Sequence, residues 1–202
     1  MSIYYIDAIR LALEEALDRD PSVFLYGQDI GEFGGAFKAT KGLKEKFPDR
    51  VVDAPISEDA IAGLAIGSAI EGMRPVIEMQ FADFSSIAFN QIVNNAATHF
   101  YRTGVPIPMV MRLPSGGTPG SGPFHSQNLE AIYSHYPGIK VVAPAFVSDA
   151  YSLLLEAIEC DDPVIYCEHK FLYRWLRTER FRPLDLPIGK GRIIRAGKHA
   201  TV

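Results

Sequence analysis

Short apolar runs alternate with longer amphipathic segments along this chain, and that alternation restricts the possible folds more than any other feature. The apolar runs predict strands at 23–26, 51–53, 75–79, 108–113, 140–143 and 163–167. Apolar residues at helical spacing predict helices at 6–20, 41–47, 58–71, 85–101, 128–135 and 148–160. Strands and helices that alternate in this way form βαβ units and a parallel sheet. We therefore expect an α/β fold of the doubly wound type, with a mostly parallel six-stranded sheet and helices on both faces.

A change of composition after residue 168 indicates where this domain ends. Arginines gather at 174–182, then Pro183 and Pro187 follow, and polar and apolar residues alternate over 191–195. We expect residues 1–180 to form one domain. Residues 181–202 are expected to be a linker and the start of a C-terminal domain that is absent from this chain.

The charge and cysteine content exclude several classes of protein. The 20 basic and 24 acidic side chains give a net charge of −4, without the basic stripe of a duplex nucleic-acid binder. No apolar run approaches the ~20 residues of a membrane span, and the N-terminus does not resemble a signal peptide. Cys160 and Cys167 match neither a zinc site nor a disulfide framework. We expect a cytoplasmic protein that binds neither nucleic acid nor a membrane.

A glycine-rich stretch at 115–122 is the most conspicuous loop of the sequence. Its glycines suggest a phosphate cradle, but the Gly-Lys-Ser/Thr ending of a P-loop is missing and the dinucleotide fingerprint does not match. A flexible surface loop is the simpler interpretation.

Four further side chains are candidates for chemistry, each with an ordinary structural alternative. Glu58 begins a predicted helix after Ser57, its expected N-cap, where an acid most simply complements the helix dipole. His125 is either a catalytic imidazole or a loop histidine, and Phe81 and Phe84 are most simply core aromatics. The residues alone therefore indicate an α/β domain whose loops are able to host a site at the strand ends.

Several stretches, spread in order over nearly the whole chain, carry a resemblance to a known family. They are 25–31 (LYGQDIG), 35–42 (GAFKATKG), 53–58 (DAPISE), 78–84 (EMQFADF), 112–117 (RLPSGG), 124–127 (FHSQ), 137–142 (PGIKVV), 162–166 (DPVIY) and 172–174 (LYR). On these stretches the chain resembles the beta subunit of the thiamine-diphosphate-dependent decarboxylating component of 2-oxo acid dehydrogenase complexes. Residues 1–180 then correspond to its transketolase-like pyrimidine-binding domain.

The resemblance implies a thiamine diphosphate site shared with an alpha subunit in an alpha-two beta-two heterotetramer. The family's Gly-Asp-Gly…Asn-Asn signature for magnesium and diphosphate is not found here, and in the family the alpha subunit carries it. Glu58 matches the carboxyl that hydrogen-bonds the aminopyrimidine ring and promotes its imino form. Phe84 matches the aromatic residue that packs on that ring, and Phe81 and Ile56 are further cofactor-binding candidates.

The resemblance also assigns a second catalytic residue and a second partner. His125 matches a histidine beside the channel through which the lipoyl arm of the acyltransferase core arrives, and its implied role is proton transfer during acylation. The glycine-rich loop then shapes that channel. The implied reaction is oxidative decarboxylation of a small 2-oxo acid followed by acylation of the lipoyl group.

A monovalent cation, usually potassium, is held at a structural site in many members of this family. The matching positions here are Met109, Ala157, Ile158, Cys160 and Asp162, mainly through backbone carbonyls. Helix-terminal carbonyls lack partners and carry negative partial charge, which suits a cation. A water molecule is the alternative occupant.

Three functional alternatives stay open from the sequence. The motifs favour branched-chain members of the family slightly over pyruvate-specific ones. An acetoin dehydrogenase or a single-chain thiamine enzyme of the transketolase type is the second possibility, although the missing diphosphate half argues against a single-chain enzyme. A truncated, non-catalytic assembly module is the third.

Overall fold

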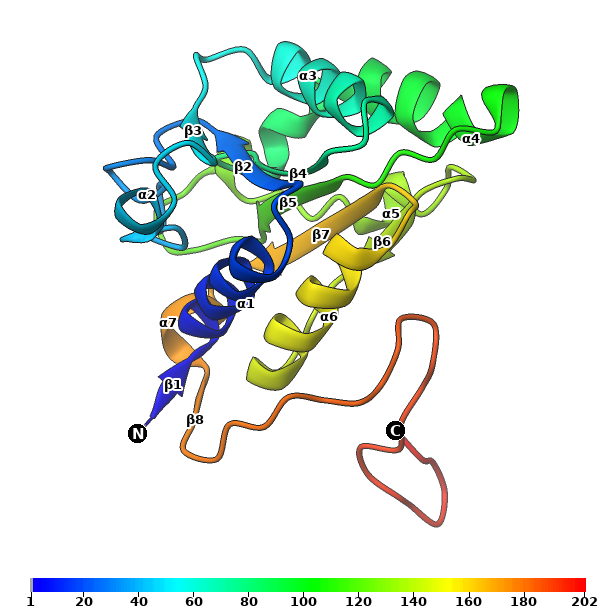
Figure 1. Cartoon of the computed structure of the whole chain (residues 1–202). Coiled ribbons are helices and arrows are strands. Elements are labelled where there is room, and N and C mark those ends of the chain that lie inside the picture. The colour runs from blue at the N-terminus through cyan, green and yellow to red at the C-terminus, as the bar shows by residue number, and fades with distance from the viewer. Residues whose placement is uncertain (1) are drawn as a thin grey trace.

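The central sheet of the computed structural model, which describes residues 2–202, confirms the predicted architecture (Figure 1). Its six strands are all parallel and lie in the order β3-β2-β4-β5-β7-β6. Their bounds are β2 Val23–Gly27, β3 Val51–Asp53, β4 Arg74–Glu78, β5 Val110–Ser115, β6 Lys140–Val142 and β7 Val164–His169. Every predicted strand is therefore present within about two residues of its expected bounds.

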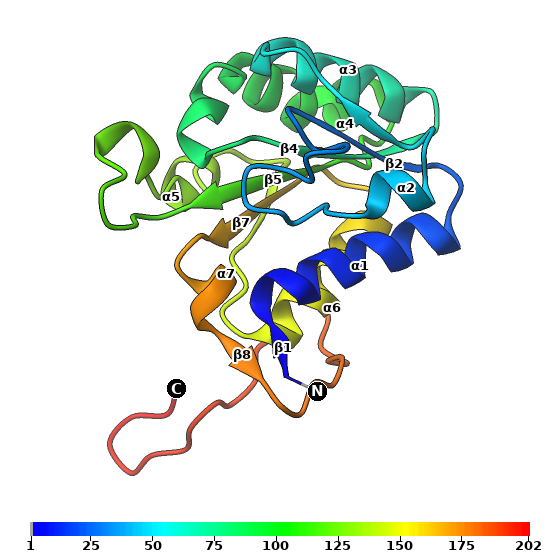
Figure 2. The same ribbon diagram turned by 90° about the vertical axis from the view of Figure 1, so that its left-hand side faces the viewer.

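Helices cover both faces of this sheet, as expected for a doubly wound fold (Figures 1 and 2). On one face α1 (Tyr5–Arg19) packs against α6 (Val147–Glu159), and on the other α3 (Glu58–Ile70) lies beside α4 (Ala97–Thr103). The short helices in the loops are α2 (Leu43–Lys46), α5 (Glu130–Tyr133) and α7 (Leu172–Trp175).

Two apolar cores result, one on each side of the sheet. Small side chains along α1, namely Ala8, Ala12 and Ala16, are buried and permit close approach of its backbone to α6 and the sheet. All six residues of β5 are buried, which is the usual state of a central parallel strand. The sheet is thus a rigid platform for the loops at its carboxyl edge.

One predicted helix is wrong in form. The expected continuous helix at 85–101 is instead a 3₁₀ turn (Ala82–Ser86), a π-helical segment (Gln91–Ala96) and α4. The hydroxyl of Ser85 donates to the carbonyl of Ala82 at 2.6 Å, and Ser86 donates to Asp83 at 2.8 Å. Such side-chain bonds to carbonyls three residues back accompany the tighter 3₁₀ turn.

Segments near both ends of the chain meet in a small second sheet. β1 (Ile3–Tyr4) pairs antiparallel with β8 (Arg177–Thr178), and two-residue strands are too short to show a sequence pattern. Residues 191–195, where polar and apolar residues alternate, are irregular in the structure. The division of the chain at residue 180 stays a prediction.

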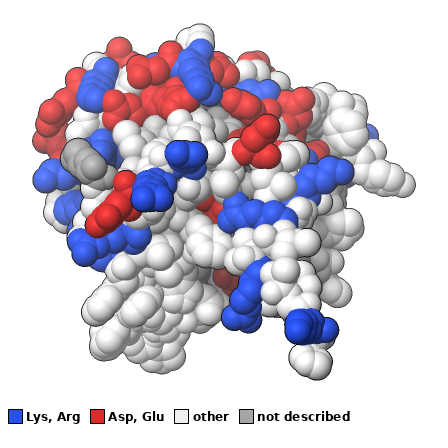
Figure 3. Space-filling model, turned by 90° about the horizontal axis from the view of Figure 1, so that it is seen from below, with Lys and Arg blue, Asp and Glu red and all other residues white. Residues whose placement is uncertain are grey.

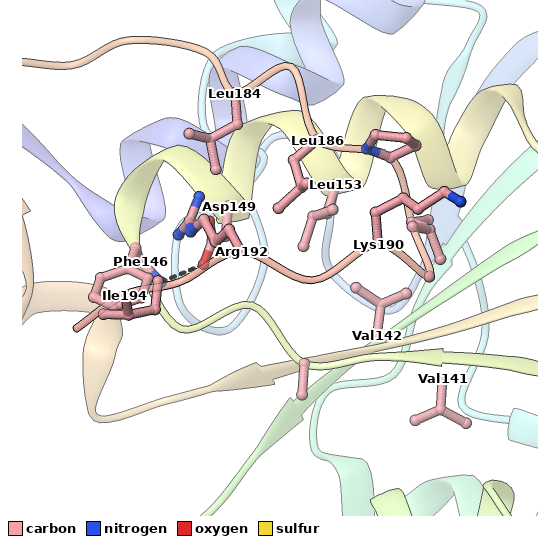
Figure 4. A pocket seen from close by; sticks show the side chains of 14 residues that line it. Val141, Val142, Phe146, Asp149, Leu153, Leu184, Leu186, Lys190, Arg192 and Ile194 are labelled. Atoms are coloured by element: carbon pink, nitrogen blue, oxygen red, sulfur yellow. Dashed lines mark hydrogen bonds and ion pairs between the residues drawn. The ribbon is translucent and has the colours of Figure 1, made fainter. Parts of the chain in front are cut away.

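The segment after residue 180 lies along the outer face of α6. Backbone N–H groups of Leu184 and Ile188 donate to Ser152 and Glu156 of this helix, each at 2.8 Å. Further along, Arg192 pairs with Asp149 at 2.8 Å (Figure 4). A mainly apolar cavity of about 340 Å³ lies between this segment and the helix.

The charged side chains follow no single pattern on the face seen in Figure 3. Most Asp and Glu lie toward one rim with some Lys and Arg among them, and further Lys and Arg lie in small groups over the rest of that face. Within the described part of the chain, no helix combines the length and apolar character needed to cross a membrane.

Candidate active site at the carboxyl ends of the strands

Most of the predicted site residues lie in loops at one edge of the sheet. Because the strands are parallel, their carboxyl ends point to the same side, where α/β proteins bind ligands. Glu58 comes soon after β3, Phe81 and Phe84 follow β4, and His125 lies in the loop after β5. Residues that are far apart in the sequence are therefore brought to the same edge of the sheet.

Glu58 is the first residue of α3 and is almost completely buried, with 6% of its surface exposed. Its Oε1 accepts a hydrogen bond of 3.1 Å from the side-chain amide of Gln28, which directly follows β2. Among the described residues, no donor contacts its second oxygen. Ser57 occupies the predicted N-cap position, but its side chain makes no capping bond. One oxygen of the carboxyl group is therefore held by Gln28, and the other oxygen is free to form a further hydrogen bond.

Phe81, Phe84 and His125 form a compact ring cluster. The His125 ring lies edge-on to Phe81, with 4.5 Å between centroids, and 5.5 Å from Phe84 at a similar angle. Phe81 also meets Phe84 at 5.8 Å and Phe37 at 5.4 Å. Such tilted contacts favour fixed ring positions. The structure thus brings His125 and the two phenylalanines together, whereas the contact described for Glu58 is to Gln28.

Large apolar side chains are exposed to solvent at this edge of the molecule. Ile56 is 85% exposed, and Phe124, next to His125, is also largely exposed. Ile56 therefore does not pack against the rings of its own chain as a core residue would. Exposed apolar groups beside a buried carboxyl are typical of a surface that a ligand or a second chain completes.

A buried network of charged side chains lies in the strands that carry the site, and sequence analysis missed it. Arg112 makes a bidentate pair with Glu168, with bonds of 2.6 and 2.8 Å, and donates to Glu78 at 2.5 Å. The Tyr173 hydroxyl also donates to Glu168, at 2.7 Å. One signal was available: charges occur at 78, 112 and 168, in or at the end of three otherwise apolar strands.

Burial and charge act on this network in opposite directions. Burial raises the pKa of Glu78, and the positive charge of Arg112 opposes that shift. Burial disfavours the charged form of Arg112, but attraction to Glu168 and Glu78 outweighs it and raises the pKa of Arg112. Gly35 packs against the Glu78 carboxylate, so the network also supports the loop that follows β2.

Two further charged residues that sequence analysis did not single out hold the loop around His125. Asp83 accepts bonds from the backbone N–H groups of Ser126 and Gln127. Lys170 donates to the carbonyl of His125 at 2.9 Å. Each contact joins residues 43 to 45 positions apart, so no local pattern reveals it.

Two of the carbonyls expected to bind potassium accept hydrogen bonds from a guanidinium. Arg74 donates to the carbonyl oxygens of Ile158 at 3.0 Å and Cys160 at 3.1 Å, at the end of α6. It also pairs with Asp161 at 2.7 Å. The guanidinium thus satisfies helix-terminal carbonyls that would otherwise lack partners.

The other expected ligands are also largely engaged. The carbonyl of Met109 accepts the N–H of Val164 at 2.9 Å, and the carboxylate of Asp162 pairs with Lys140 at 2.9 Å. Ala157 is buried within α6. Each carbonyl oxygen keeps a second lone pair beside the bond described, and potassium at this position stays a prediction.

The groups at the carboxyl edge fit one half of the implied cofactor. A buried carboxyl with one free oxygen can share a proton with a ring nitrogen, and the phenylalanine cluster suits an aromatic ring face. Within the described residues, no group of three or more His, Cys, Asp and Glu side chains is arranged to hold a metal ion.

Known proteins share this sequence pattern and fold. The family model described as "Transketolase, pyrimidine binding domain" matches residues 1–175. The chain is 48% identical to 2-oxoisovalerate dehydrogenase subunit beta of Bacillus subtilis, covering 98% of this chain and 62% of that protein. It is 42% identical to pyruvate dehydrogenase E1 component subunit beta of Rickettsia conorii, covering 100% of this chain and 63% of that protein. It therefore spans less than two thirds of the length of these relatives.

A solved structure agrees at the level of the fold. The chain matches a "Split gene transketolase, inactive beta4 tetramer" with a TM-score of 0.75 and 23% sequence identity. The match covers 97% of this chain and 60% of that one. The six-stranded parallel sheet and its helices are thus an arrangement that other proteins share.

Proposed function

Because this chain belongs to the transketolase pyrimidine-binding domain family, we propose that it is the pyrimidine-binding part of a thiamine-diphosphate-dependent 2-oxo acid dehydrogenase beta subunit. The observation that carries the proposal is the buried carboxyl of Glu58, which begins α3 at the carboxyl edge of the sheet. The similarity to beta subunits of two such dehydrogenases supports it.

Glu58 is the residue that activates the cofactor in this proposal. Bound thiamine diphosphate supplies a carbon nucleophile and an electron sink for decarboxylation. The free oxygen of Glu58 would hold a proton against a ring nitrogen of the aminopyrimidine, while Gln28 fixes the carboxyl group. Phe84, supported by Phe81, would pack on the ring face, and exposed Ile56 would close the site from the side.

His125 is the second catalytic residue that we propose. An imidazole both accepts and donates protons near neutral pH, which suits proton transfer to a sulfur atom of a lipoyl group. Its position beside the phenylalanine cluster keeps the ring close to the proposed cofactor face. The glycine-rich loop before it would border the route of the lipoyl arm.

The proposed partners follow from what this chain contributes. An alpha subunit, in an alpha-two beta-two assembly, would supply the diphosphate and magnesium half of the site, and a lipoyl acyltransferase would accept the acyl group. We favour a branched-chain 2-oxo acid over pyruvate, since identity is 48% to the 2-oxoisovalerate enzyme subunit and 42% or 44% to subunits of pyruvate enzymes.

Decarboxylation is expected to require the alpha partner. The purified chain should not turn over 2-oxoisovalerate or pyruvate with thiamine diphosphate, magnesium and an artificial electron acceptor. Addition of an alpha subunit from a related 2-oxoisovalerate dehydrogenase should restore turnover. Carbon dioxide release measured with and without that subunit tests this, and turnover by the chain alone would contradict a shared site.

His125→Ala is expected to separate the two half-reactions. Decarboxylation with an artificial acceptor should persist, while acylation of a lipoyl domain falls by about 10²–10⁴-fold, the usual cost of losing a proton-transfer group. His135→Ala is the matched control, because that histidine is exposed and belongs to no part of the proposed site.

Two other outcomes would count against this role of His125. If the histidine only orders its loop, both rates fall together and the unfolding temperature drops. If it binds the substrate carboxylate, the Michaelis constant rises in both assays. Selective loss of lipoyl acylation at an unchanged unfolding temperature is the expected result.

A further inference from the structure

We propose that Asp83 and Lys170 act together as positioning residues that fix His125 for proton transfer, an inference that rests on the proposed function of this histidine. The pair is called here the 83/170 clamp. Asp83 lies in the 3₁₀ turn after β4, and Lys170 directly follows β7. Both positions lie within a few residues of the carboxyl end of a strand, whereas His125 lies in a long loop after β5.

The acidic half of the clamp holds two successive peptide N–H groups. Asp83 is 5% exposed, and its Oδ1 accepts from the N–H of Ser126 at 3.2 Å and of Gln127 at 3.3 Å. Its Oδ2 is buried without a hydrogen-bond partner among the described residues. Burial of a carboxylate costs free energy unless hydrogen bonds compensate it, which indicates that Asp83 has a role other than packing.

The basic half of the clamp holds the peptide group just before these two. Lys170 is also 5% exposed, and its Nζ donates to the carbonyl of His125 at 2.9 Å. The ammonium lies 5.2 Å from the ring centroid of Phe81, which itself contacts the His125 ring. Within the described residues, no carboxylate lies within 4.0 Å of this ammonium, so its hydrogen bond is to the loop and not to an ion-pair partner.

The loop is closed at its base by the same elements. The backbone N–H of Lys170 donates to the carbonyl of Ser115 at 2.9 Å, and the backbone N–H of Gly116 donates to the carbonyl of Gln127 at 3.0 Å. Gly116 has a φ of +78° and lies against the His169 ring, where a Cβ atom would come within 2.2 Å. Residues 125–127 are thus held from both sides, while the intervening glycine-rich segment is mostly exposed.

Opposite charges suit this arrangement. The carboxylate of Asp83 faces N–H dipoles and the ammonium of Lys170 faces a carbonyl dipole, so each charge meets the favourable end of a peptide group. Burial lowers the pKa of Lys170, and the charge of Asp83 opposes that shift. The two side chains are therefore coupled through space as well as through the backbone between them.

The first test measures whether Lys170 acts through His125. In the complex reconstituted with an alpha subunit, Lys170→Met should lower lipoyl acylation by about 10- to 100-fold, the scale of a small misplacement, with little change in decarboxylation. Lys170→Arg, which keeps a donor, should recover most of the rate. Lys140→Met, at an exposed lysine on the opposite edge, is the matched control.

A double variant gives the sharpest outcome. If the clamp serves His125, then adding Lys170→Met to His125→Ala should cost less than twofold more, since the group being positioned is already absent. An equal loss in both backgrounds would overturn the inference. Absence of any decarboxylation in the reconstituted wild type would instead contradict the proposed function, so the two failures are distinguishable.

The second test needs neither cofactor nor partner. In NMR spectra of the chain labelled at histidine, the ring protons of His125 should show ring-current shifts from Phe81 and Phe84. Lys170→Met should move them toward solvent-exposed values, while Lys170→Arg and Lys140→Met should not. Unchanged His125 shifts in a folded Lys170→Met chain would overturn the inference. If that variant does not fold, Lys170→Gln, which is polar but shorter, carries the same test.

Discussion

Glu58→Gln is expected to reduce turnover of the reconstituted complex by about 10²–10⁴-fold, the usual cost of losing a general acid or base. The amide still occupies the space beside Gln28 and still forms hydrogen bonds, but it cannot exchange a proton with a ring nitrogen. The loss should appear in decarboxylation itself, measured as carbon dioxide release with an artificial acceptor. Thermal unfolding of the chain should change little, because size and hydrogen bonding are preserved.

The adjacent acid supplies a matched control for this substitution. Asp59 is in the same first turn of α3, and its carboxylate accepts a bond from Gln91 at 3.3 Å, away from the proposed site. Asp59→Asn removes the same charge from the same helix N-terminus and should keep nearly full turnover. Turnover within a few-fold of wild type in Glu58→Gln would falsify the role assigned to that carboxyl.

The central strands of the sheet were predictable because they are buried on both faces and read as mainly apolar runs. β5 and β7 are such strands, and each ends in a charged or polar residue at the carboxyl edge. The break in the helix at 85–101 was not predictable in the same way. It is accompanied by hydroxyl bonds of Ser85 and Ser86 to nearby carbonyls, which helical periodicity does not reveal.

The candidate site was predictable only in part. Glu58, Phe84 and His125 were identified through a resemblance, because as single residues each had a simpler structural interpretation. Gln28 and Lys170 were missed because their significance lies in contacts to residues 30 and 45 positions away. Such contacts exist only once parallel strands have brought their carboxyl ends to one edge.

Arg112→Met is expected to destabilise the chain by about 3–5 kcal/mol, the usual cost of breaking a buried ion pair from one side. Glu78 and Glu168 would then be left buried without their shared cation. The free energy of unfolding of an ordinary domain is only about 5–15 kcal/mol, so a loss of this size removes much of it. Urea denaturation measures the change. Arg10→Met, at a partly exposed pair with Glu14, should cost less than about 1 kcal/mol.

The pH dependence of the Arg112→Met defect identifies its cause. Burial raises the pKa of Glu78 and Arg112 opposes the shift, so removing Arg112 raises that pKa further. A group with a raised pKa in the folded state stabilises that state at low pH and loses this contribution as pH rises through the folded pKa. The defect should therefore be smaller at about pH 5 than at about pH 8.

A triple variant separates charge from packing in the same network. Adding Glu78→Gln and Glu168→Gln to Arg112→Met removes both stranded charges while keeping side-chain volume, so most of the lost stability should return. If the triple variant is as unstable as Arg112→Met, the guanidinium stabilises the fold by packing, and charge balance is not its role. Recovery of stability without recovery of turnover would show that the network also seats the loops of the site, since Gly35 packs against Glu78.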